Sequence, residues 1–279
     1  MQEYYFLFAL ALIWTVFATV QDLRTREVAN WLNFSLIAFA LSYRAFYSIS
    51  TQNYNFLIFG LLGFAIFFAL GHAFYYGKAF AGGDAKLLMG YGAILPYQSY
   101  SNLLSITILF LFFLFLTGAI YSLLYSAGIL AKNKTKFTKE FKKRTKKHKN
   151  LLTLSLVLLA ISIIFSIINP IMFSVTLLLL IPLIYLYTIS IDKCMVKLVP
   201  PSKLTEGDWI EQNVKIGKTT IKKSVHGLSL KEIKLLKKYK KSILIKEGIP
   251  FTPAFLITLM IMALFFLTSK LPLPFSFLF

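Results

Sequence analysis

The sequence predicts an all-α polytopic membrane protein with about eight transmembrane helices and a small cytoplasmic α+β insertion. Hydrophobic residues make up 57% of its 279 positions, and the mean hydropathy is +0.70. These residues gather into runs close to the roughly 20 residues that cross a bilayer as a helix. Nearly all basic residues lie between the runs, a pattern typical of proteins that cross the membrane several times.

Eight apolar runs are expected to span the membrane. The first lacks the basic start and small-residue cleavage site of a secretory signal, and Asp22 follows it directly, so we expect it to be retained as a helix. The fourth is short and carries Lys86, and Asn169-Pro170 is expected to form the turn between the sixth and seventh. The predicted spans are Tyr4–Val20, Trp31–Ile49, Asn55–Tyr76, Ala85–Tyr97, Leu103–Leu130, Leu151–Ile168, Ile171–Ile191 and Ile249–Thr268.

The distribution of positive charge predicts the orientation. With the N-terminus placed outside, four loops face the cytoplasm, and they hold 28 of the 30 Lys and Arg residues. Because cytoplasmic loops are enriched in these residues, we expect a multi-pass protein of the cell membrane with both termini outside. Only Arg44 and Lys270 fall on the outer side. The four cytoplasmic loops are 21–30, 77–86, 131–150 and 192–248.

The spans divide the chain into five expected segments. The basic loop 131–150 is expected to bind anionic lipid headgroups, and the membrane context argues against a nucleic-acid partner despite the formal net charge of +19. Residues 192–248 are expected to form the insertion, with a strand over 213–218 and a helix from an N-cap at Ser229 to about Lys241. The remaining segments are a membrane core with both aspartates at 1–130, a transmembrane hairpin at 151–191, and the last helix with its tail at 249–279.

Cysteine and histidine form no pattern typical of a cofactor site. The single cysteine, Cys194, excludes an intramolecular disulfide and a Cys-x-x-Cys zinc site. The three histidines, His72, His148 and His226, are scattered, which argues against a multi-histidine metal centre. We therefore expect neither a metal nor another cofactor.

Two of the eleven acidic residues directly adjoin apolar runs. Asp22 ends the first predicted span and Asp84 opens the fourth, both on the predicted cytoplasmic side. An ionisable group at a membrane boundary is costly to desolvate, which favours a functional role. Two close carboxylates in a poorly hydrated site share one proton, so one can take a proton from water while the other polarises a peptide carbonyl. The alternative is structural, with Asp84 as a helix N-cap and Asp22 paired with Arg24 or Arg26.

Three motifs then resemble the type IV prepilin peptidases. The stretch 22–32 (DLRTREVANWL) is similar to their first-loop pattern, 81–88 (AGGDAKLL) to their Gly-x-Gly-Asp-x-Lys-Leu signature, and 249–254 (IPFTPA) to the entry of their last helix. Ala81 replaces the first Gly of the signature, and Ala29 replaces a Pro common in bacterial members. With no Cys-x-x-Cys pairs and a polar insertion before the last helix, the chain looks more like the archaeal preflagellin and prepilin peptidases.

The resemblance implies an aspartic endopeptidase that removes the short basic leader from pilin-like or archaellin-like precursors on the cytoplasmic face. Asp22 and Asp84 would be its catalytic dyad, the glycines would let substrate backbone approach, and amino-methyltransferase activity is not expected. The other active-site loop residues that it implies are Gly82, Gly83, Lys86, Arg24 and Asn30.

Other functions stay open at this point. Presenilin-like and signal-peptide-peptidase-like proteases also carry Gly-x-Gly-Asp, but they place a Tyr before the first Asp, where this chain has Gln21. A non-enzymatic transporter or filament-assembly platform would use the two aspartates as ion-relay or structural groups. A transporter should also carry polar residues deep in several spans, and these spans offer mainly scattered Ser, Thr and Tyr.

Overall fold

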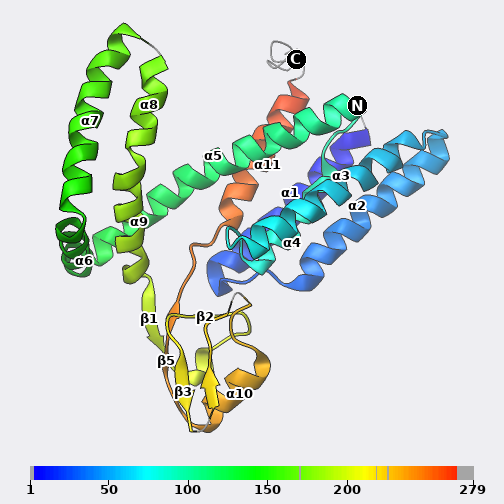
Figure 1. The fold of residues 1–279 in the computed structure, drawn as a ribbon. Helices are drawn as coiled ribbons and strands as arrows, with labels where there is room; N and C mark the ends of the chain where they lie inside the picture. The colour runs from blue at the N-terminus through cyan, green and yellow to red at the C-terminus, as the bar shows by residue number, and fades with distance from the viewer. Residues whose placement is uncertain (1–2, 170, 218, 225, 269–279) are drawn as a thin grey trace. The chain divides into compact units, whose positions relative to one another are not determined.

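Figure 1 shows the computed structural model of the protein, which describes residues 3–169, 171–217, 219–224 and 226–268. The chain divides into two compact units, Met1–Leu123 with Ile249–Phe279 and Leu124–Gly248. Long helices dominate both units, and the described strands all belong to the second. The structure confirms the predicted class, an all-α polytopic membrane protein with a small strand-containing insertion.

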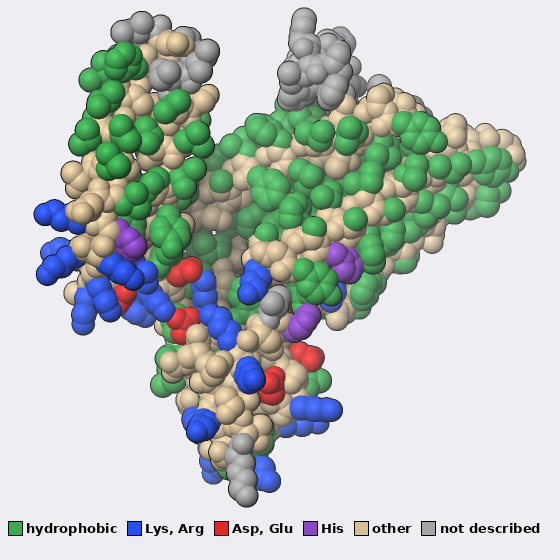
Figure 2. Space-filling model, in the orientation of Figure 1, with side chains coloured by type: hydrophobic (Ala, Val, Ile, Leu, Met, Phe, Trp, Pro, Cys, Tyr) green, Lys and Arg blue, Asp and Glu red, His purple; other side chains and the backbone are tan. Residues whose placement is uncertain are grey.

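The first unit is a bundle of apolar helices. Their outward faces carry many large hydrophobic side chains, and Figure 2 shows green patches of them over much of the visible face, as expected where lipid is the solvent. Its described helices are α1 (Glu3–Thr25), α2 (Asn30–Thr51), α3 (Asn55–Tyr76), α4 (Gly82–Ile94), α5 (Tyr100–Lys132, which continues into the second unit) and α11 (Thr252–Leu267).

Five described segments are long and apolar enough to cross a membrane. They are α1, α3, α5, Lys149–Ile167 and Phe173–Cys194. Three further predicted spans correspond to less apolar or shorter helices: α2 carries Arg44, α4 has 13 residues, and α11 has 16.

Glycines bring α3 and α4 into backbone contact. A Cβ added to Gly63 would lie 2.3 Å from the Gly92 carbonyl oxygen, and one added to Gly92 would lie 2.4 Å from that of Gly63. About two helical turns further along, a Cβ on Gly71 would lie 2.9 Å from the Ala85 carbonyl oxygen. Small residues at a helix interface permit this approach in membrane proteins, where dispersion contacts drive packing. The contact fixes α4, the helix that carries Asp84.

Arg44 is fully buried and holds the C-terminal end of α4. Its guanidinium donates hydrogen bonds of 2.7 Å to the carbonyl oxygens of Ala93, Leu95 and Phe56. The last carbonyls of a helix have no intrahelical partner and carry partial negative charge, so a cation satisfies them well. A Cβ on Gly60 would lie 2.2 Å from Arg44 Cδ, so this glycine makes room for the arginine stem.

The structure adds two details to the predicted layout of the second unit. Its described helices are α6 (Lys134–Lys147), α7 (Lys149–Ile168), α8 (Ile171–Leu179) and α9 (Ile181–Cys194), so the basic segment expected as a loop is largely helical. The rings of Phe137 and Phe141 stack one turn apart, and Phe137 also contacts Tyr187, which gives α6 an apolar side for packing. Lys and Arg side chains gather over α6 in Figure 2.

The predicted seventh span corresponds to Phe173–Cys194, a segment long and apolar enough to cross a membrane, and it consists of two helices, α8 and α9. The helix breaks at Leu180 because Pro182 lies in the first turn of α9, where it lacks an N–H and clashes with the preceding turn. The predicted Asn169-Pro170 turn lies between α7 and α8, with Pro170 itself outside the described residues.

Residues 196–246 form a small α+β domain within the second unit. An antiparallel sheet has the order β1-β5-β2, from β1 (Val196–Val199), β5 (Ile243–Lys246) and β2 (Trp209–Ile210), and β3 (Val214–Ile216) pairs with β4 (Thr219–Ile221). The predicted strand is β3, and the predicted helix is α10 (Leu230–Lys238), which ends three residues earlier than expected. Ser229 and Glu232 form the capping box at its start. Ile233 and Leu236 of α10 are buried in the domain's apolar cluster.

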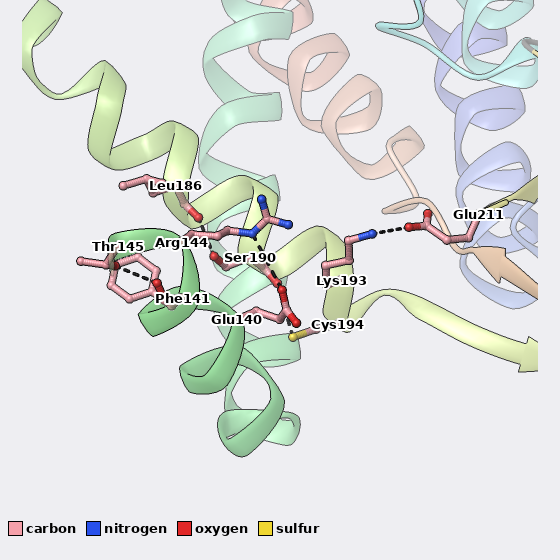
Figure 3. A network of polar contacts seen from close by, with 9 residues as sticks. All are labelled: Glu140, Phe141, Arg144, Thr145, Leu186, Ser190, Lys193, Cys194 and Glu211. Atoms are coloured by element: carbon pink, nitrogen blue, oxygen red, sulfur yellow. Dashed lines mark hydrogen bonds and ion pairs between the residues drawn. The ribbon is translucent and has the colours of Figure 1, made fainter. Parts of the chain in front are cut away.

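Ion pairs join the end of α9 to this domain, as Figure 3 shows for Lys193 and Glu211. The hydrogen bond from Lys193 holds the pKa of the Glu211 carboxyl below its usual range. A second pair joins Asp192 to Lys246 at 2.6 Å. Because partly exposed pairs contribute little individually, we interpret them as fixing orientation rather than supplying stability.

Candidate active site

Asp22 lies in the last turns of α1 and is only 6% exposed. Its Oδ2 accepts hydrogen bonds from Thr252 Oγ1 at 2.9 Å and from the Thr252 backbone N–H at 3.2 Å. The backbone N–H of Phe251 also contacts this carboxylate. The first N–H groups of a helix have no partner within it and carry partial positive charge, so the start of α11 is a favourable place for an anion.

Asp84 lies in the first turn of α4 and is 8% exposed. The backbone N–H of Ala81, the N-cap of α4, contacts its carboxylate. Asp22 lies within electrostatic range of Asp84, so two helices distant in sequence bring the two carboxylates into one buried region. Asp84 is therefore not the N-cap that the structural alternative required, although it satisfies one N–H at the helix start.

The two signature glycines differ in their surroundings. A Cβ on Gly83 would lie 3.2 Å from Val28 Cβ, in the loop after α1, whereas a Cβ on Gly82 would make only an ordinary contact of 3.6 Å with Tyr75. The fully buried Asn33 donates from Nδ2 to the Gly83 carbonyl oxygen at 3.3 Å. The loop after α1 and the start of α4 therefore lie against each other at Gly83.

The predicted active-site loop residues do not all contact one another. Lys86 Nζ donates to Asn30 Oδ1 at 2.6 Å and lies 6.0 Å from the ring centroid of Phe34, so these residues link α4 to the start of α2. Arg24 is exposed and is not part of this pair. Arg26, the other basic residue of the loop, lies within electrostatic range of Asp22.

Sequence reasoning missed two polar residues beside the dyad, Thr252 and Asn33. Thr252 lies within the IPFTPA motif, but a threonine between two prolines suggests only a helix start. Asn33 follows Asn30 by one helical turn, so both amides lie on one face of α2. This spacing is the sequence feature that could have pointed to Asn33. Among the described residues, Asn33 Oδ1 and Thr19 Oγ1 are buried without a hydrogen-bond partner.

The described residues contain no group of three or more His, Cys, Asp or Glu side chains that could hold a metal ion. The arrangement present is a buried carboxylate pair with hydrogen-bond donors on one member. Such a pair can perform general acid–base chemistry on a bound peptide.

Comparison with known proteins agrees with the motifs. The model of the type IV leader peptidase family matches residues 9–123, which include both aspartates. The chain is 32% identical over 126 residues to a preflagellin peptidase of Methanococcus maripaludis, covering 42% of this chain and 54% of the relative. It is 33% identical over 101 residues to the preflagellin peptidase of Methanococcus voltae (34% and 42%), and 33% over 89 residues to that of Methanocaldococcus jannaschii (32% and 38%).

These matches confirm the predicted family resemblance for the membrane core. The chain spans about half the length of the curated relatives it matches. No solved structure matches the chain. The family match ends before α11, the helix that supplies Thr252 to Asp22.

Proposed function

We propose that this chain, whose residues 9–123 match the model of the type IV leader peptidase family, is a membrane-embedded aspartic endopeptidase. Its substrates would be pilin-like or archaellin-like precursors, from which it removes a short basic leader. The observation that carries the proposal is the pair Asp22 and Asp84, which are buried, come from different helices and lie within electrostatic range. The preflagellin peptidase relatives support the substrate class.

In the proposed reaction, the ionised carboxylate takes a proton from water as the water oxygen bonds to the scissile carbonyl carbon. The carbonyl oxygen takes the proton of the other carboxyl, which gives a tetrahedral diol. The first carboxyl then protonates the amide nitrogen, and the C–N bond breaks with its electron pair on nitrogen. One diol proton returns to the second carboxylate, so the dyad is restored and one water is consumed.

The site would face the cytoplasm together with residues 192–248, with both chain termini outside, because the four loops placed inside hold 28 of the 30 basic residues. This face is basic, and so is the expected leader, so charge would not recruit the substrate. We expect the apolar segment of the precursor to dock among the helices instead. A precursor that keeps this segment but lacks its leader charges should still be cleaved. We expect no methyltransferase activity, because the chain has one cysteine.

Cleavage of a precursor panel in membranes tests the proposal. Asp22→Asn and Asp84→Asn keep size and hydrogen bonding but cannot share a proton, so each should reduce cleavage by about 10²- to 10⁴-fold, the range for general acid–base catalysis. Asp208→Asn is the matched control, since Asp208 lies in the small domain, where its carboxylate accepts a hydrogen bond from the nearby Thr205 N–H. Normal cleavage by both dyad variants would refute the mechanism. A wild type that inserts but cleaves no precursor would favour the filament-assembly platform.

A further inference from the structure

The two aspartates of the site have unequal surroundings. Thr252 donates two hydrogen bonds to one oxygen of Asp22, from Oγ1 at 2.9 Å and from N at 3.2 Å. Thr252 is fully buried and is the first residue of α11. The hydroxyl is therefore held against the carboxylate by the helix that it begins.

Asp22 also meets most of the positive potential at the site. The N-terminus of α11 faces it through the N–H groups of Thr252 and Phe251, and Arg26 reaches it from the end of its own helix. From α4, the carboxylate of Asp84 lies within electrostatic range of Asp22. Donors and a helix N-terminus favour a negative charge at Asp22.

Asp84 has much weaker support. Its carboxylate meets the backbone N–H of Ala81 and the like charge of Asp22. Among the described residues, no side chain donates a hydrogen bond to it. If the proton that the pair shares lies on Asp84, the negative charge lies on Asp22, where the hydrogen-bond donors stabilise it best.

We propose that Thr252 is a positioning residue that divides the roles of the dyad. Its donors hold Asp22 as the carboxylate that takes the proton from water, and they leave on Asp84 the proton that goes to the scissile carbonyl oxygen. This inference rests on the proposed endopeptidase function. It concerns a residue outside the 9–123 family match and on a different helix from either aspartate.

The matched test compares threonine substitutions at two buried sites on α11. Thr252→Val keeps the side-chain shape and the backbone donor but removes the hydroxyl, and a hydrogen bond to a charged group corresponds to roughly a 10- to 100-fold effect. We expect kcat for leader cleavage to fall by about that factor with KM nearly unchanged, because Thr252 acts through Asp22. Thr252→Ser restores the donor and should recover most of the rate.

Thr258→Val is the control. Thr258 is equally buried on the same helix, but its hydroxyl pairs with Thr117 Oγ1 at 2.7 Å, away from the dyad. It should leave kcat within about threefold of wild type, although it also removes a buried hydrogen bond. An equal loss of kcat in both valine variants, no loss in Thr252→Val, or no recovery in Thr252→Ser would overturn the inference.

An infrared spectrum of the purified protein tests the assignment of the proton. The stretching band of a protonated carboxyl should disappear in Asp84→Asn and keep its intensity in Thr258→Val. Persistence of the band in Asp84→Asn with its loss in Asp22→Asn would reverse the assignment. If wild type does not cleave, or if Asp22→Asn cleaves normally, the endopeptidase function itself fails, so the two failures are distinguishable.

Discussion

Replacing Arg44 should loosen the C-terminal end of α4 and so reduce the activity of a site at the opposite end of the same helix, where Asp84 lies. Arg44→Met keeps an apolar stem but removes the donors to the three carbonyl oxygens that accept at 2.7 Å, those of Ala93, Leu95 and Phe56. Each buried acceptor left without a partner costs about 1–3 kcal/mol, but burial of the guanidinium is itself unfavourable, so we expect a net loss of about 3–5 kcal/mol. Arg44→Lys should recover little, because one ammonium on an unbranched stem lacks the planar fork that reaches all three oxygens.

The assay is thermal unfolding of the detergent-purified protein together with leader cleavage in membranes. Arg44→Met should lower the unfolding midpoint clearly and reduce cleavage, because α4 also carries Asp84. Lys139→Met is the control, since Lys139 is an exposed basic residue on α6, in the second unit. Equal midpoints for Arg44→Met and wild type would refute the conclusion that Arg44 holds the end of α4.

Two further predictions use matched pairs. Gly83→Ala should reduce cleavage several-fold more than Gly82→Ala, because a Cβ at Gly83 would lie 3.2 Å from the loop after α1, whereas one at Gly82 meets its nearest neighbour at 3.6 Å; equal cleavage by the two variants would contradict this. The second concerns Glu211, whose folded-state pKa is lowered by the hydrogen bond from Lys193. The ion pair should contribute less than about 1 kcal/mol to the free energy of unfolding, because it is partly exposed. This contribution should be present at pH values above 4.5, the ordinary pKa of a glutamate, and should be lost as the pH falls below that value. Unfolding measured against pH should show this loss in wild type and Glu206→Gln but not in Glu211→Gln.

The sequence was sufficient to predict structural features that depend on a single segment of the chain. Apolar runs predicted the helices, and the spacing of Ser229 predicted the start of α10, because hydropathy and capping are local properties. The sequence did not show two details of the second unit, one set by a proline and one by packing. Pro182 divides the seventh span, and the basic segment becomes α6 because its two phenylalanines have an apolar surface to pack against.

The candidate site illustrates the same limit. Asp22 and Asp84 could be singled out because acidic residues adjoining apolar runs are rare. Thr252, the hydrogen-bond partner of Asp22, could not be identified from the sequence, because it is 230 residues away and resembles any threonine at a helix start. Only the tertiary packing of α1 against α11 shows that this hydroxyl is directed at the carboxylate.

The burial of Arg44 also bears on the proposed orientation. In the sequence this residue is one of two exceptions to the inward placement of positive charge. Loop charges orient a membrane protein through their interaction with the translocation machinery and lipid headgroups, which requires them to lie near the membrane surface. Arg44 is instead fully buried and bound to backbone carbonyls, so its charge stabilises a helix end rather than marking a face. With Arg44 set aside, only Lys270 opposes the orientation in which the site faces the cytoplasm, and the charge argument for that orientation becomes stronger than the sequence alone suggested.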